Sequence, residues 1–123
     1  MTIEKQLLAH CLKKDFYKQV TDVIGKEMFA NGVGTIFDTI AFAHVKYNSD
    51  LTVEELMHLH RDKFPSMPDS SRESVEDVIK DLRNFSGNPD ITKDLVTNFW
   101  RRNKAHEIGS MATILGYKVW LTI

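Results

Sequence analysis

Cysteine, proline and glycine are all scarce in this chain of 123 residues, which contains one cysteine, three prolines and six glycines. A single cysteine, Cys11, excludes an internal disulfide and is typical of a reducing compartment, so we expect a cytoplasmic protein. Neither sign of charge dominates, since sixteen basic and seventeen acidic side chains give a formal net charge of −1. That balance provides no general attraction for nucleic acid or for an anionic membrane surface.

Uninterrupted apolar segments are short, and none reaches the roughly 18 residues that a membrane-spanning helix requires. No internal repeat is visible, which excludes a solenoid. The chain also lacks Gly-x-x-x-x-Gly-Lys-Ser/Thr and Gly-x-Ser-x-Gly, the motifs of phosphate-binding loops and of nucleophile elbows. We therefore expect no catalytic residue, no cofactor and no membrane partner for this chain.

Apolar residues recur at intervals of three and four, which predicts an all-α fold: a compact bundle of short helices followed by one long helix. Helix starts are predicted from capping residues, which are Thr2, Asp15, Thr92 and the capping boxes Thr52–Glu55 and Ser70–Glu73. The helix after Asp15 is expected to end at Gly25, and another is expected over about 35–47. The predicted core comprises inward-facing apolar residues: Leu8, Phe16, Val20, Ile36, Phe37, Ile40, Leu56, Val78, Ile79 and Leu82.

The last predicted helix runs from Thr92 to about Lys118 and would be roughly 40 Å long. Its apolar face is larger than one side of a small bundle covers, so we predict an assembly surface there. The residues of that surface are Phe99, Trp100, Ile108, Met111 and Leu115. Since the chain ends on the apolar run Val119-Trp120-Leu121-Thr122-Ile123, we expect the natural chain to continue or a partner to cover this end.

A basic group, Arg101, Arg102 and Lys104, follows two aromatic residues on the same helix. It could contact phosphates or stack on bases, or it could be a solvated helix face, because acidic residues lie within two turns. His58 and His60 are two positions apart and so point away from each other on a helix, whereas helical metal pairs are three or four apart. No metal site is expected, and Cys11, on an apolar face, is expected to pack as a small hydrophobe.

The order of these residues resembles the amino-terminal domain of the DnaB-like replicative DNA helicases, particularly the version in T4-type bacteriophages. The resemblance covers almost the whole chain as apolar patterning. It lies in Glu4-x-x-Leu7-Leu8-x-x-x-Leu12, in Phe16, Val20 and Phe29, in Ile36-Phe37-x-x-Ile40, in Leu51-Thr52-x-x-Glu55-Leu56, and in Phe99-Trp100-Arg101-Arg102-Asn103-Lys104-Ala105. The chain departs from bacterial members at Gly34, where they carry a histidine.

This resemblance implies a helical head over residues 1–88 and, over 89–123, the first arm of a helical hairpin. It implies a collar domain without catalysis of its own, which pairs with neighbouring subunits as a homodimer or in a hexameric ring and docks primase. ATP and Mg²⁺ would belong to a carboxy-terminal motor domain, which this chain does not contain.

Two other classes of function are open to a small helical domain. The first is a helical DNA-binding regulator that uses the face of Arg101, Arg102 and Lys104. The long terminal helix and the neutral net charge argue against this class, since helix-turn-helix proteins require a short recognition helix after a tight turn. The second is a small enzyme that uses Cys11 or a histidine, but no set of polar residues at suitable spacing accompanies them.

Overall fold

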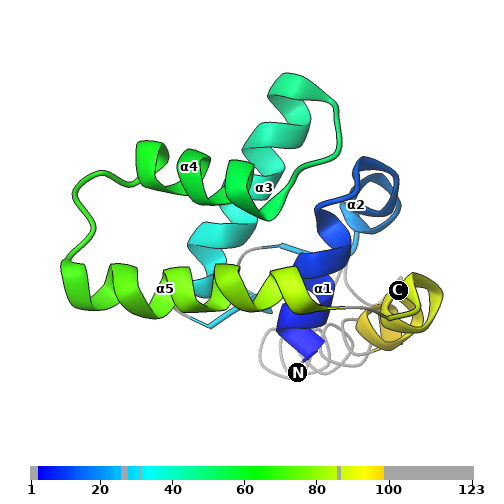
Figure 1. Ribbon diagram of the computed structural model, residues 1–123. Helices are drawn as coiled ribbons and strands as arrows, with labels where there is room; N and C mark the ends of the chain where they lie inside the picture. Colours follow the sequence, from blue (N-terminus) through cyan, green and yellow to red (C-terminus); the bar gives the residue numbers. More distant parts are fainter. Residues whose placement is uncertain (1–2, 26–27, 31, 86, 99–123) are drawn as a thin grey trace, which may run out of the picture.

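The computed structural model describes residues 3–25, 28–30, 32–85 and 87–98, and the regular elements of these ranges are helices (Figure 1). Five α-helices and one 3₁₀ turn are followed by a helix that begins at residue 89 and is described to residue 98. The elements are α1 (Ile3–Cys11), α2 (Lys14–Val20), α3 (Val33–Tyr47), α4 (Val53–Lys63), α5 (Asp69–Asp81) and η2 (Leu82–Asn84). The predicted all-α class is confirmed.

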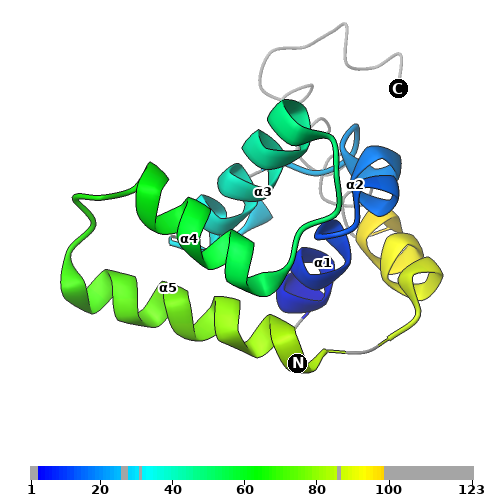
Figure 2. The ribbon, with the colours of Figure 1, turned by 45° about the horizontal axis from the view of Figure 1, so that its top comes forward.

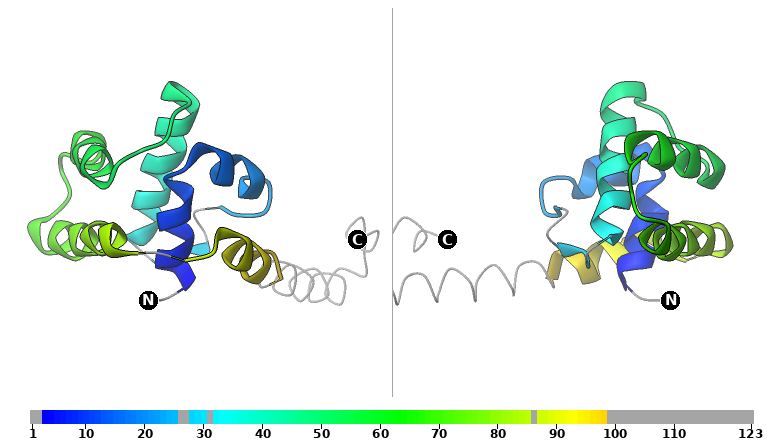
Figure 3. Two further views of the ribbon diagram at one scale, coloured as in Figure 1. Left: turned by 45° about the vertical axis from the view of Figure 1, so that its right-hand side comes forward. Right: turned by 90° about the vertical axis from the view of Figure 1, so that its left-hand side faces the viewer.

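Helix α3 is the centre of the bundle, because it contacts α1, α2, α4 and α5. Ile36, Ile40 and Ala43 on its inner side have no exposed surface. Helices α4 and α5 run side by side in opposite directions across α3, while α1 and α2 form a corner beside it (Figures 1 and 2). The helix over 89–98 lies on the α1 and α2 side of the molecule (Figures 1 and 3).

The predicted core is buried, apart from Val78, which is only partly buried against it. Ile3 and Tyr47 each lie four positions from a buried residue of the same helix, Leu7 and Ala43, so the apolar spacing predicts that they face inward, yet they are 39% and 50% exposed. Both lie at helix ends, where the neighbouring helix no longer covers them. The apolar periodicity therefore identifies the inner faces correctly and overstates their length.

The capping box at the start of α4 is confirmed. The Glu55 backbone N–H donates to Thr52 Oγ1 at 3.1 Å, and the Thr52 N–H donates to Glu55 Oε1 at 2.8 Å. Further along, Arg61 donates from two nitrogens to the two carboxylate oxygens of Glu76, each at 2.8 Å, and so joins α4 to α5. The hydrogen bond from Arg61 holds the pKa of the largely buried Glu76 carboxyl below its ordinary value.

The predicted cap of α2 is wrong. Helix α2 begins one residue before Asp15, and its N-cap residue is Lys13, which makes no side-chain capping bond. The first amide, Lys14 N–H, donates instead to Oδ1 of Asp50 at 2.9 Å, across 36 residues of sequence. The side chain that satisfies an amide at the start of this helix therefore comes from a distant aspartate and not from Asp15. The helix also ends at Val20, before the predicted Gly25.

The second capping box is wrong as well. Helix α5 begins at Asp69 with Pro68 as its N-cap residue, so Ser70 is already inside the first turn. Pro68 has a φ of −58° and an extended ψ of 147°, and it has no N–H that would need an acceptor there. The helix therefore begins two residues earlier than the predicted capping box implies. Ser70 uses its carbonyl oxygen as a helical acceptor, which also receives a hydrogen bond from the Ser74 hydroxyl at 3.2 Å.

Thr92 does not cap the last helix, which begins three residues earlier. Asn88 precedes it, and Pro89 occupies the first helical position. The Asp90 N–H donates to Asn88 Oδ1 at 2.9 Å, and the Thr92 N–H donates to the Asn88 carbonyl oxygen at 3.2 Å. Thr92 itself is buried within the helix.

Candidate docking surface

The residues predicted as the assembly surface and as the basic group lie outside the described residues. They are Phe99, Trp100, Ile108, Met111 and Leu115 for the first, and Arg101, Arg102 and Lys104 for the second. The structure describes residues 89–98, the first ten residues of the helix that was predicted to carry them. The described part of the candidate docking surface therefore consists of residues 89–98 and the side chains that they contact.

The helix over 89–98 has one covered side and one bare apolar edge. Thr92 and Val96, four positions apart, face the bundle and are almost fully buried. Ile91 and Leu95, also four positions apart, are 58% and 50% exposed. The Lys93 ammonium donates to Gln19 Oε1 of α2 at 3.1 Å. The helix is thus held on the bundle while an apolar stripe beside the contact stays open.

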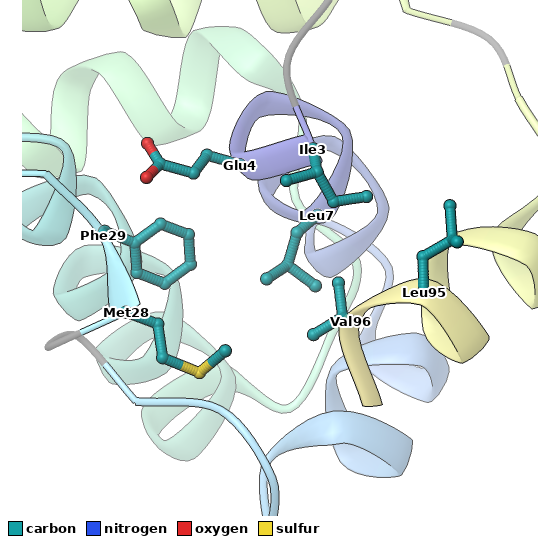
Figure 4. A pocket seen from close by; sticks show the side chains of 7 residues that line it. All are labelled: Ile3, Glu4, Leu7, Met28, Phe29, Leu95 and Val96. Atoms are coloured by element: carbon teal, nitrogen blue, oxygen red, sulfur yellow. The ribbon is translucent and has the colours of Figure 1, made fainter. Parts of the chain in front are cut away.

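An apolar pocket of about 290 Å³ opens beside this stripe (Figure 4). Its walls come from α1, from the segment 28–30 and from the helix over 89–98, through Ile3, Glu4, Leu7, Met28, Phe29, Leu95 and Val96. Leu7, Met28, Phe29 and Val96 turn toward the same space, while the Glu4 carboxylate lies to one side (Figure 4).

Packing behind the pocket holds its walls in place. The Phe29 ring stacks on Phe37 of α3, with centroids 5.2 Å apart and planes at 24°. Leu7 is 3% exposed and belongs to the core cluster. Since these side chains are fixed from behind, the pocket is preformed. Preformed apolar depressions beside an exposed stripe are the places where a partner's apolar side chain anchors an interface.

The residues that line the pocket provide mainly apolar contacts. Among the described residues that line it, Glu4 is the one that is charged, and the volume of about 290 Å³ lies just below the roughly 300–1,000 Å³ that small-molecule sites occupy. A substrate site needs several convergent polar groups, which the described lining does not provide. Its size and lining fit the side chain of a protein partner.

Three of the described histidines, His10, His44 and His60, make structural contacts. His60 Nε2 lies 2.9 Å from Thr35 Oγ1, and His44 Nε2 donates to the Cys11 carbonyl oxygen at 2.6 Å. Burial lowers the pKa of His10 and His60, and burial raises the pKa of the Cys11 thiol, so the neutral forms are favoured. Within the described ranges, no three His, Cys, Asp or Glu side chains gather to hold a metal ion.

Part of this surface was predictable from sequence and part was not. Leu95 lies on the apolar face that periodicity predicts, but Met28 and Phe29 follow a turn whose position in space has no local signal. In the described chain, no helix has the length and apolar character to cross a membrane. No family model, curated protein or solved structure matches this sequence.

Proposed function

We propose that this chain is the amino-terminal collar domain of a replicative DNA helicase, a module without catalysis that assembles subunits and docks primase. The observation that carries the proposal is the bare stripe of Ile91 and Leu95 beside the apolar pocket. The helical patterning that resembles the DnaB-like family supplies the identity of the assembly. The proposed site of action is the host cytoplasm.

The stripe of Ile91 and Leu95 favours assembly because it enlarges an apolar surface that is already exposed. Ile3, at the pocket edge, is 39% exposed, and the sequence after residue 98 continues with Phe99 and Trp100. Soluble monomers usually expose apolar patches of no more than a few hundred Å². A second copy related by a two-fold axis would cover the same stripe on both subunits at once. On this proposal, Arg101, Arg102 and Lys104 lie at the rim and meet acidic groups or DNA.

Sedimentation velocity of the full chain at tens of micromolar tests the assembly. We expect a dimer or larger species that Leu95→Asp and Ile108→Asp convert to a monomer with an unchanged helical circular dichroism spectrum. Lys18→Asp is the control, since Lys18 is an exposed residue of α2 and the variant adds the same acidic side chain away from the stripe and the pocket. A wild type that stays monomeric at every concentration would overturn the proposal.

Two further measurements test the helicase assignment. The complete open reading frame should contain a downstream Gly-x-x-x-x-Gly-Lys-Ser/Thr, and the purified chain alone should not hydrolyse ATP. ATP turnover that a substitution in this chain abolishes would contradict the assignment. Tight, salt-dependent DNA binding by a monomer, lost on replacing Arg101 and Arg102 with alanine, would support a DNA-binding regulator instead.

A further inference from the structure

A second group of exposed apolar residues lies on the last turns of α3. Phe42 and Val45 are 41% and 83% exposed, and Tyr47 is half exposed. None of them lines the pocket beside α1. The carboxy-terminal end of α3 projects from the bundle on the side away from the helix over 89–98 (Figure 3). This group of residues is therefore separate from the surface beside α1.

Two lysines hold their ammonium groups near one aromatic ring, that of Phe42. Lys46 Nζ lies 5.5 Å from the centroid of the Phe42 ring and 5.4 Å from that of Tyr47. Lys63 Nζ, at the end of α4, lies 5.0 Å from the Phe42 ring centroid on the other helix. Cation–π attraction of this kind keeps a lysine near the ring instead of letting it sample solvent. We call Phe42, Val45, Lys46, Tyr47 and Lys63 the α3 patch.

Neither lysine is neutralised within the described part of the chain, where no carboxylate forms an ion pair with Lys46 or Lys63. The lysines of α1 and of the loop after it differ, because Lys5 pairs with Asp81 at 2.7 Å and Lys13 lies 3.9 Å from Asp50. The α3 patch therefore combines an exposed apolar centre with two cations that lack an acidic partner.

The patch is held by packed elements. Helices α3 and α4 are in contact along the bundle. The residue after α4, Phe64, has its ring 5.8 Å from Lys63 Nζ, and its carbonyl oxygen accepts a hydrogen bond from the Arg72 guanidinium of α5. The α3–α4 packing thus fixes the backbone positions from which the two lysine side chains extend. A partner would meet a preformed surface.

The charge of the residues around the α3 patch favours a protein over a nucleic acid as its binding partner. The stretch from Phe42 to Phe64 carries three basic residues, Lys46, Arg61 and Lys63, and four acidic ones, Asp50, Glu54, Glu55 and Asp62. Protein–DNA interfaces are much more positively charged than this. Val45, the most exposed apolar residue, offers an aliphatic contact that neither a base nor a phosphate requires. An apolar centre with a charged rim is the composition of a protein–protein interface.

We propose that the α3 patch docks an acidic amphipathic helix of a partner protein. An apolar side chain of that helix would rest on Val45 and the Phe42 ring edge, and carboxylates on either side of it would pair with Lys46 and Lys63. The inference does not depend on the helicase assignment. It concerns a different face of the molecule and different residues.

A chemical-shift titration of the full chain with synthetic helical peptides tests the proposal. The probe is a peptide with a leucine stripe flanked by glutamates, and the matched peptides carry lysines in place of the glutamates or serines in place of the leucines. We expect the glutamate–leucine peptide alone to shift the resonances of the α3 patch. The double variant K46E/K63E should weaken its binding by about tenfold or more.

The control variant is K18E/K80E, which makes the same charge change at exposed lysines of α2 and α5. It should bind the peptide within about twofold of the wild type, because screening at physiological salt confines electrostatic effects to roughly 8 Å. Val45→Ser should also weaken binding and leave the fold intact, since that side chain is almost fully exposed.

Several outcomes would overturn the proposal. These are no shift in the α3 patch, equal binding of the lysine-flanked peptide, and equal loss of binding in the control variant. A single-stranded oligonucleotide that shifts the same resonances more strongly would assign the patch to nucleic acid. Self-association that K46E/K63E abolishes would assign it to a second copy of the chain.

Discussion

Replacing Phe37 with alanine should give a clear loss in the free energy of unfolding of the bundle. Phe37 lies on the central helix α3, is 6% exposed, and contacts the rings of Phe29 and Tyr17, with centroids at 5.2 and 6.2 Å. Truncation to alanine removes a buried ring and leaves a cavity, which costs about 3–5 kcal/mol in well-packed cores. The higher helix propensity of alanine returns only about 0.5 kcal/mol. We therefore expect Phe37→Ala to lower the free energy of unfolding by about 3–4 kcal/mol.

Urea unfolding followed by circular dichroism measures this loss. Phe42→Ala is a matched control, because Phe42 is the same residue type on the same helix and is 41% exposed. It should cost no more than about 1 kcal/mol, as surface substitutions usually do. A loss below about 1 kcal/mol for Phe37→Ala, or equal losses for the two variants, would refute the assignment of the inner face of α3.

Three further predictions concern capping, pH and thiol reactivity. Thr52→Ala should lower the free energy of unfolding by about 1 kcal/mol in the same urea experiment, whereas Ser70→Ala, at a position that does not cap, should change it by less than about 0.5 kcal/mol. Burial, helped by the nearby Arg72 guanidinium, holds the pKa of His60 below its ordinary value of about 6.5. As the pH falls, the unfolded chain therefore binds this proton before the folded chain does, so part of the folding stability present at neutral pH is lost below about 6.5. In thermal melts between pH 7 and 5, the melting temperature of His60→Gln should fall less than that of the wild type. Cys11 should react with an aromatic disulfide reagent much more slowly in buffer than in urea, because its thiol is buried and its pKa is raised; equal rates would place it at the surface.

The features that the sequence predicts correctly depend on residues that lie close together in the chain. The Thr52–Glu55 capping box needs partners three positions apart, so the pattern and the hydrogen bonds coincide. The inner faces of α3 and α5 follow from helical periodicity, because a bundle must bury one stripe of each helix. Val78 departs from the predicted core since it sits at the margin of the α5 stripe, where burial depends on the exact rotation of the helix.

The features that the sequence does not predict are those in which a residue distant in the chain takes the place of a local one. Asp15 is a good capping residue by composition, yet Asp50 approaches the first amide of α2 from another loop. The pocket beside α1 has the same origin, because the chain brings Leu7, Phe29 and Val96 together from three separate segments. The spacing of apolar residues within one segment does not show which other segments that segment contacts in the fold. Lys63 and Phe42 of the α3 patch also come from different helices.

The loop between α3 and α4 has a consequence for how the chain folds. It turns through Asn48, whose φ of 50° is left-handed, and then reaches back to the corner between α1 and α2. There Asp50 receives the Lys14 N–H, and the Leu51 N–H donates to the Leu12 carbonyl oxygen at 2.8 Å. The corner is therefore incomplete until residue 51 has been synthesised and the loop has closed. The Leu51 amide, whose hydrogen bond closes this corner, should therefore be protected from hydrogen exchange in the folded chain, and the first two helices should not fold on their own.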